Sequence, residues 1–482
     1  MARSGLFQRF GTILGIFAML ASCGGGGGGG GGAPIAGGGG AGGAGAAPAT
    51  CSLLDRQNWA AAQLREWYLF PETLPATLSP ASYTTVQDYI DALTATARSQ
   101  RRDRFFTYIT SIAEENAFFT SGSSAGFGVR LATDATARRV FIAEAFEGAP
   151  ALAAGIDRGT EILAIGTSAA NLRTVDSIIA TEGTAGITNA LGPSTAGTAR
   201  LLRIRDAAGT RDVNVTKADY NLTPVSSRYG ARIINDGGRQ VGYVNLRTFI
   251  DSADPALRNA FAQFRAAGIT DVIVDFRYNG GGLVSIAELM GDLLGADRST
   301  ANVFSITAFR AEKASNNSTR QFRPQPQSIA PTRIAFIGTS ATASASELVI
   351  NSFIPYLGNR AALVGTNTYG KPVGQIGLDR SQCDDRLRVV AFATQNSAGQ
   401  GAYFDGLAGV VQASCAASDD VNFPLGDPRE SSVARALDFL AGRPCAPVTA
   451  GTVSAQSARE GQRTLLTPER PAVAQREVPG LF

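Results

Sequence analysis

Nucleophilic catalysis in this chain would have to rely on a base other than histidine, because the 482 residues include none. The absence excludes a Ser-His-Asp triad, a Cys-His pair and any histidine-ligated metal site. Lysine occurs only at Lys217, Lys313 and Lys371, although arginine is abundant. Arginine keeps its proton in proteins, whereas a lysine amine can lose it, so each lysine is a candidate general base as well as a candidate surface residue.

The best candidate nucleophile lies in the run Thr-Ala-Ser-Ala-Ser-Glu at 342–347. This run follows an expected strand at 333–338 and opens an expected helix. A serine at a helix start lies among unpaired backbone N–H groups at the positive end of the helix dipole, where the next amide can stabilise an oxyanion. Ordinary N-capping would also explain one serine here. We take Ser344 as the nucleophile, with Ser346 and Ser340 as alternatives.

A parallel sheet would bring this serine and Lys371 together. Strand-like runs alternate with helical stretches beyond about residue 226, at 241–246, 271–276, 333–337, 361–364 and 387–393. This alternation predicts a parallel α/β core, in which the carboxyl ends of the strands share one edge. Three loops should converge at that edge, namely 278–282, 342–347 and 366–371. A lysine enclosed there would have a depressed pKa and could accept the serine proton.

A separate β domain is expected before this core. Residues 117–225 change to short strand-like runs between turns, and the loop Gly126-Phe127-Gly128-Val129 precedes one of them. Glycines beside a strand edge let successive N–H groups converge on an anion, such as the C-terminal carboxylate of a peptide. A tight turn that needs glycine only for its backbone is the alternative. Residues 51–116 carry apolar side chains at helical spacing and predict an N-terminal helical segment.

The first 50 residues predict an exported lipoprotein. Positive residues precede an apolar run at 11–21, which is too short to span the ~30 Å hydrocarbon core of a bilayer. Leu20-Ala21-Ser22-Cys23 resembles a bacterial lipobox, which implies removal of a signal peptide at 1–22 and acylation of the Cys23 thiol. A plain secretory signal is the alternative. Residues 23–50 are nearly all Gly and Ala and predict a flexible tether. The folded part would then be anchored to a membrane and face the periplasm or the cell exterior.

Four further cysteines, an even number, predict two disulfides in an exported chain: Cys51, Cys383, Cys415 and Cys445. Of the three possible pairings we favour Cys383 with Cys415, which bracket a local segment, and Cys51 with Cys445, which bracket the folded body. The polar, proline-containing stretch 446–482 is predicted to be disordered.

The balance of charged residues indicates which classes of partner to expect. Lys and Arg number 43 against 40 Asp and Glu, and no basic cluster with interleaved aromatic residues occurs. Nucleic acid is therefore not an expected partner. No metal and no cofactor are expected.

Three motifs taken together resemble the C-terminal processing peptidases, also called tail-specific proteases. They lie in this order along the chain: Asp275-Phe276-Arg277-Tyr278-Asn279-Gly280-Gly281-Gly282, Thr342-Ala343-Ser344-Ala345-Ser346-Glu347 and Thr368-Tyr369-Gly370-Lys371-Pro372-Val373-Gly374-Gln375. The resemblance implies an α/β fold with a crotonase-like or ClpP-like catalytic core at 226–445, and it identifies residues 117–225 as similar to an inserted PDZ domain. The segment between the serine and lysine motifs is a couple of residues longer than in better-known members.

The resemblance also implies roles for individual residues. Ser344 would be the nucleophile, Lys371 the base of a Ser-Lys dyad, and Gln375 the polar residue that orients the lysine amine. The oxyanion would be bound by the amides of Ala345 and Gly281. The implied activity is that of a serine endopeptidase that forms an acyl-enzyme on exported or unfolded polypeptides recognised through their C-termini.

Two other functions compete with this one. A membrane-tethered, PDZ-type peptide-binding protein without catalysis is the main alternative, but retention of both Ser344 and Lys371 argues against it. Acyl-CoA chemistry on a crotonase-like core is disfavoured by the predicted export and disulfides.

Overall fold

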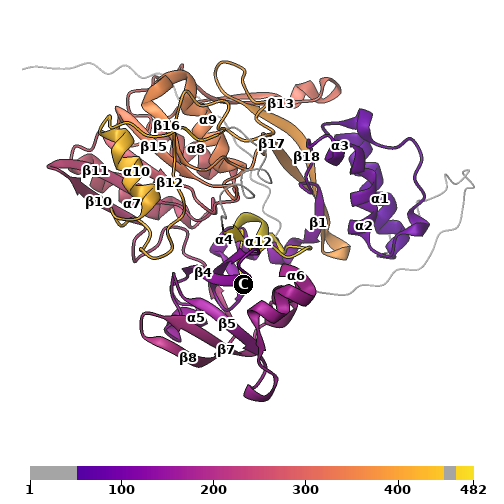
Figure 1. The fold of residues 1–482 in the computed structure, drawn as a ribbon. Helices are drawn as coiled ribbons and strands as arrows, with labels where there is room; N and C mark the ends of the chain where they lie inside the picture. Colours follow the sequence, from indigo (N-terminus) through magenta and orange to yellow (C-terminus); the bar gives the residue numbers. More distant parts are fainter. Residues whose placement is uncertain (1–50, 450–462) are drawn as a thin grey trace, which may run out of the picture. The chain divides into compact units, whose positions relative to one another are not determined.

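The computed structural model describes residues 51–449 and 463–482 (Figure 1). The predicted signal peptide, the lipidation site at Cys23 and the Gly-rich tether lie outside these described residues. In the two described ranges, no helix combines the length and the apolar character that a membrane crossing requires.

The glycine, serine and lysine motifs lie around a six-stranded sheet with the order β10-β11-β12-β15-β16-β19. All neighbouring pairs are parallel except β10 with β11. The strands are β10 (Ala231–Asp236), β11 (Arg239–Asn245), β12 (Asp271–Asp275), β15 (Arg333–Gly338), β16 (Ala361–Gly365) and β19 (Ala413–Ala416). The predicted parallel α/β core is therefore present.

Helices cover both faces of this sheet because its strands are apolar on both faces. Side chains of α7 (Ala253–Ala266), α8 (Val284–Leu293) and α9 (Ala345–Leu357) share a buried cluster with one face. Side chains of α10 (Ser431–Leu440) share another with the opposite face. Alternate strand residues point to the two clusters, as the two-residue period of a strand requires.

A second, antiparallel sheet has the order β1-β18-β13-β14, with β17 also paired to β18. Its strands are β1 (Tyr108–Ser111), β13 (Val303–Phe309), β14 (Ser318–Gln321), β17 (Val373–Arg380) and β18 (Asp385–Gln395). The run 387–393 was expected in the parallel core but lies in β18, because β17 and β18 form a hairpin after the lysine loop. The N-terminal helices α1 (Leu53–Trp67) and α2 (Val86–Leu93) pack on this sheet.

Most of the remaining helices and strands build the β-rich region, whereas α3 (Ala95–Ser99) packs with α1 and α2. Its main sheet has the order β20-β3-β4-β5-β7-β8, in which β20 is Thr464–Leu465; β6 pairs with β5, and β2 pairs with β9 separately. The elements are α4 (Ile112–Ser121), β2 (Ser123–Gly126), β3 (Val129–Asp134), β4 (Arg139–Ala145), α5 (Pro150–Ala153), β5 (Glu161–Gly166), β6 (Arg173–Thr174), α6 (Val175–Leu191), β7 (Ala199–Asp206), β8 (Gly209–Thr216) and β9 (Ala218–Asn221).

The favoured disulfide pairing is wrong. The structure joins Cys51 to Cys383 and Cys415 to Cys445, with Cα–Cα distances of 5.6 and 5.4 Å. Cys51 precedes α1, which packs on the sheet that contains β18, and Cys383 lies in the β17–β18 turn. Cys415 lies in β19, and the chain after α10 returns beside it, where Ala416 N donates to Ala446 O at 2.7 Å. Tertiary packing determines both pairings. The positions of the cysteines along the sequence do not reveal this packing.

The expectation of a disordered stretch at 446–482 also fails for its last part. Residues 463–482 contain β20 (Thr464–Leu465) and the short helix α12 (Val473–Glu477). Apolar side chains order this segment: Leu466, Val473, Val478 and Phe482 are buried among residues of the β-rich region and α4. We call residues 463–482 the C-terminal segment.

Candidate active site

Ser344 lies at a strained turn between β15 and α9. It is the N-cap of α9 and has a φ of 56°, which is uncommon for a residue with a side chain. Such strain persists only where surrounding contacts impose it, and it is concentrated at functional sites. Ser346 is fully buried, and its Oγ donates to Asn279 O at 3.2 Å. Ser340 precedes the helix. Of the three serines, only Ser344 occupies the N-cap position of α9.

Glu347 links the turn at Ser344 (the serine turn) to the loop that carries Lys371 (the lysine loop). Its buried carboxylate accepts hydrogen bonds from the backbone N–H of Ser344 (3.0 Å), Gly370 (2.7 Å) and Lys371 (2.7 Å). Tyr369 N also donates to Thr342 O, at 2.9 Å. The loops at the ends of β15 and β16 therefore meet at one edge of the sheet, as the parallel topology predicts.

Lys371 is half-buried beside aromatic and amide groups. Its Nζ donates to Gln375 Oε1 at 3.0 Å and lies 5.1 Å from the centre of the Phe106 ring. Gln375 in turn donates through Nε2 to Phe106 O, which fixes the orientation of its amide. Burial lowers the pKa of Lys371, while the nearby Glu477 carboxylate acts against this shift. Among the described residues, Lys371 Nζ and Ser344 Oγ share no hydrogen bond.

The glycine loop at 280–282 lies directly against the serine. Ala343 N donates to Asn279 O at 3.0 Å, and a Cβ placed on Gly281 would lie 2.7 Å from Ser344 Cβ. Gly281 has a φ of 123°, and its N–H donates to Asn279 Oδ1 at 2.9 Å. The N–H of Ala345 has no hydrogen-bond acceptor in the described part of the chain. Of the two predicted oxyanion donors, the Ala345 amide is thus free and the Gly281 amide is engaged.

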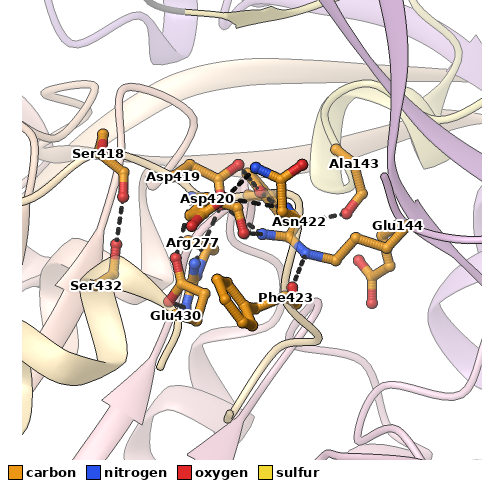
Figure 2. A network of polar contacts seen from close by, with 12 residues as sticks. Ala143, Glu144, Arg277, Ser418, Asp419, Asp420, Asn422, Phe423, Glu430 and Ser432 are labelled. Atoms are coloured by element: carbon orange, nitrogen blue, oxygen red, sulfur yellow. Dashed lines mark hydrogen bonds and ion pairs between the residues drawn. The ribbon is translucent and has the colours of Figure 1, made fainter. Parts of the chain in front are cut away.

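A buried ionic network holds the residues that lead into the glycine loop. Arg277 is ion-paired with Asp419 at 3.1 Å and with Glu430 at 2.9 Å, and Figure 2 shows it between them. The Tyr278 hydroxyl donates to Asp419, which also pairs with Arg158 of the β-rich region at 2.7 Å. Burial alone would raise the pKa of Asp419, but the two arginines lower it well below its usual value. Removing one partner of such a network leaves a buried charge, which costs ~3–5 kcal/mol.

The predicted carboxylate-binding loop binds a main-chain oxygen of the C-terminal segment. Gly128 N and Val129 N donate to Phe482 O at 2.9 and 3.2 Å. A Cβ on Gly126 would lie 2.8 Å from Phe482 C, so glycine permits the close approach. Gly128 has a φ of 74°, and the Phe127 side chain is buried in the β-rich region. The positive φ of Gly128 and the close approach at Gly126 therefore both favour glycine, and the role of this loop in binding a peptide carboxylate stays a prediction.

Sequence reasoning missed several residues that position the site. Glu347 was part of the serine motif but had no assigned role. Asn279 and Arg277 stood in the glycine motif without an assigned role, because their partners lie far away in the sequence. Glu477 was overlooked because its segment was expected to be disordered.

Known proteins share parts of this sequence. Residues 240–407 match the model of peptidase family S41. A carboxyl-terminal-processing protease of Picosynechococcus sp. is 28% identical over 256 residues, which cover 52% of this chain and 55% of that protein. The chloroplastic C-terminal processing peptidase of Tetradesmus obliquus is 25% identical over 283 residues, 54% of each chain. The chain thus spans about half the length of these curated relatives.

A solved structure shares the fold. It is that of a protein from Bacteroides fragilis assigned to the S41 proteases, with a TM-score of 0.60 and 22% identity, and the match covers 80% of this chain and 97% of that one. Residues 240–407 are therefore similar to peptidase family S41, and C-terminal processing peptidases are among the proteins that the chain resembles.

Proposed function

We propose that this protein is a serine endopeptidase in which Ser344 is the nucleophile and Lys371 the general base. The observation that carries the proposal is the Glu347 carboxylate, which holds the backbone of both residues in one site of a chain without histidine. A serine with φ of 56° at a helix start and a half-buried lysine with a lowered pKa suit these two roles.

The proposed reaction is an acyl transfer in two stages. Neutral Lys371 takes the proton of Ser344 Oγ as Oγ attacks the scissile carbonyl carbon. The Ala345 N–H stabilises the oxyanion, joined by the Gly281 N–H once Asn279 releases it. The protonated lysine then gives its proton to the leaving amine, and water attacks the acyl-enzyme with Lys371 again as base. Gln375 orients the amine through its carbonyl oxygen.

The substrates in this proposal are exported or unfolded polypeptides recognised by their C-termini. Support comes from the PDZ-like loop, whose Gly128 and Val129 amides already bind a main-chain oxygen. We further propose that acylation of Cys23 anchors the protein to a membrane, with the folded part in the periplasm or outside the cell. A peptide-binding protein without catalysis remains the second candidate, because the same loop favours it.

Incubation with unfolded casein, followed by mass spectrometry of the products, separates these functions. Endopeptidase activity predicts internal cleavage products that are absent with Ser344→Ala. A good peptide substrate is expected to be cleaved more slowly after its C-terminus is amidated, because the amide cannot offer a carboxylate to the Gly128 and Val129 amides. Binding without any cleavage would favour the second candidate, and equal rates for free and amidated peptides would contradict recognition through the terminal carboxylate.

A further inference from the structure

The C-terminal segment occupies the open edge of β3. Thr464 and Leu465 pair with Thr133 and Ala132, and Leu481 forms an antiparallel bridge with Arg130. Leu131 N donates to Gly480 O at 2.8 Å, and Phe482 N donates to Val129 O at 2.9 Å. Together with the two bonds to Phe482 O, these contacts are those of a peptide that adds a strand to a sheet edge. The C-terminal segment therefore occupies the edge of β3 in the way in which a bound peptide would.

Apolar side chains of the segment are buried in this arrangement. Phe482 is 3% exposed and shares a cluster with Phe127 and Val129. Val478 and Leu481 are buried against Tyr108, Phe118 and Phe146. The segment is thus seated by side chains as well as by backbone hydrogen bonds.

The same segment reaches the catalytic loop. Gly280 N donates to Glu477 O at 3.0 Å, and a Cβ on Gly280 would lie 2.3 Å from Arg476 O. Arg130 donates through Nη1 to both Tyr278 O (2.7 Å) and Pro479 O (2.8 Å), so one guanidinium holds the segment to the glycine loop. A polypeptide that approaches Ser344 along this loop would meet the segment.

Glu477 also acts on the lysine electrostatically. The Glu477 side chain is buried, and after burial itself it has the largest influence on the pKa of Lys371, in the direction that keeps the amine protonated. Asp103 acts in the same direction, whereas Arg476 and Arg388 act in the opposite one. A protonated Lys371 cannot take the proton of Ser344.

We propose that residues 463–482 form an intramolecular inhibitor, which fills the peptide groove and covers the catalytic loop until a polypeptide C-terminus displaces it. This inference rests on the peptidase function proposed above. The contacts of the segment are those of a blocker and not of a substrate. The Glu477 carbonyl accepts from Gly280 N and not from the free Ala345 N–H, and Glu477 is the last residue of helix α12. Covalent attachment gives such a ligand an effective concentration in the ~mM range.

The first test measures whether the C-terminal segment occupies the edge of β3, in chains that lack the proposed nucleophile. A fluorescein-labelled peptide with the sequence of residues 473–482 is titrated against two full-length chains, Ser344→Ala and Ser344→Ala with Phe482→Asp. The aspartate would be buried among apolar groups and should expel the segment, while the groove itself stays intact. We expect the labelled peptide to bind the double variant about tenfold more tightly or better, because it no longer competes with a seated segment. Equal affinities for the two chains would overturn the proposal.

The second test measures casein cleavage. Phe482→Asp, with Ser344 present, should cleave unfolded casein about tenfold faster or better than the parent chain. Glu477→Gln should shift the rise of kcat/KM to lower pH, because Lys371 loses the charge that favours its protonated form. Glu469→Gln is the matched control, since it makes the same change at an exposed carboxylate of the segment, and it should behave as the parent.

The outcomes separate the two proposals. Tighter peptide binding with no casein cleavage by any variant would support the seated segment and contradict the peptidase function. Tighter binding with equal casein cleavage by parent and Phe482→Asp would contradict inhibition and leave the peptidase function intact.

Discussion

Lys371→Arg is expected to lower peptide cleavage by about 10²- to 10⁴-fold, the usual contribution of a general base. Arginine reaches a similar position and keeps the positive charge, but it does not give up its proton. The substitution therefore distinguishes a base from a cation that only orients the site. The measurement is kcat/KM for a fluorogenic peptide.

The pH dependence of kcat/KM in the same assay tests whether Lys371 must be neutral. The lysine must be neutral to accept a proton, so the parent rate should rise with pH through the pKa of Lys371. Because burial lowers this pKa, the rise should lie below the ordinary value of 10.5. The rise should be missing in Lys371→Arg. Lys313→Arg is the matched control: Lys313 is ion-paired with Glu66 outside the site and should keep the parent rate and profile. Near-normal turnover by Lys371→Arg would refute the dyad.

Glu347→Ala is expected to have the second largest effect, a fall in kcat of about 100-fold. Three backbone N–H groups would lose their acceptor, and the serine turn and the lysine loop would no longer be tied together. A displacement of ~1 Å in a catalytic geometry can cost ~10²-fold in rate. Each buried N–H left without a partner also costs ~1–3 kcal/mol, so the melting temperature should fall as well.

Glu347→Gln separates positioning from stability. The amide keeps one acceptor oxygen and the shape of the side chain, so folding should be largely preserved. Because the second oxygen is replaced by a donor, it cannot accept from all three N–H groups. We expect kcat to fall while KM changes little. A variant with normal stability and normal kcat would show that Glu347 does not position the site.

The sequence predicted the part of the site that depends on strand order. The alternation beyond residue 226 was enough to place the serine turn, the lysine loop and the glycine loop at one edge, because parallel strands end together. Motif resemblance supplied the individual roles of Ser344, Lys371 and Gln375, and the hydrogen bond between Lys371 and Gln375 agrees with the orienting role.

Contacts between distant segments could not be predicted in this way. The run 387–393 looks like a core strand, yet it pairs with the hairpin partner β17. The disulfides join segments that only the packing of α1 and the return of the chain after α10 bring together. The C-terminal segment contains charged residues and prolines, but its apolar residues are sufficient to hold it on β3.

The central claim is that Ser344 is a nucleophile activated by Lys371, and covalent labelling tests it most directly. The parent chain and its variants are treated with a small fluorophosphonate, which reacts with activated serines, and the adduct is located by peptide mass spectrometry. We expect one adduct on Ser344 in the parent chain, none in Ser344→Ala, and labelling at least about 100-fold slower in Lys371→Arg. An adduct on Ser346 or Ser340, or equal labelling rates for the parent and Lys371→Arg, would contradict it.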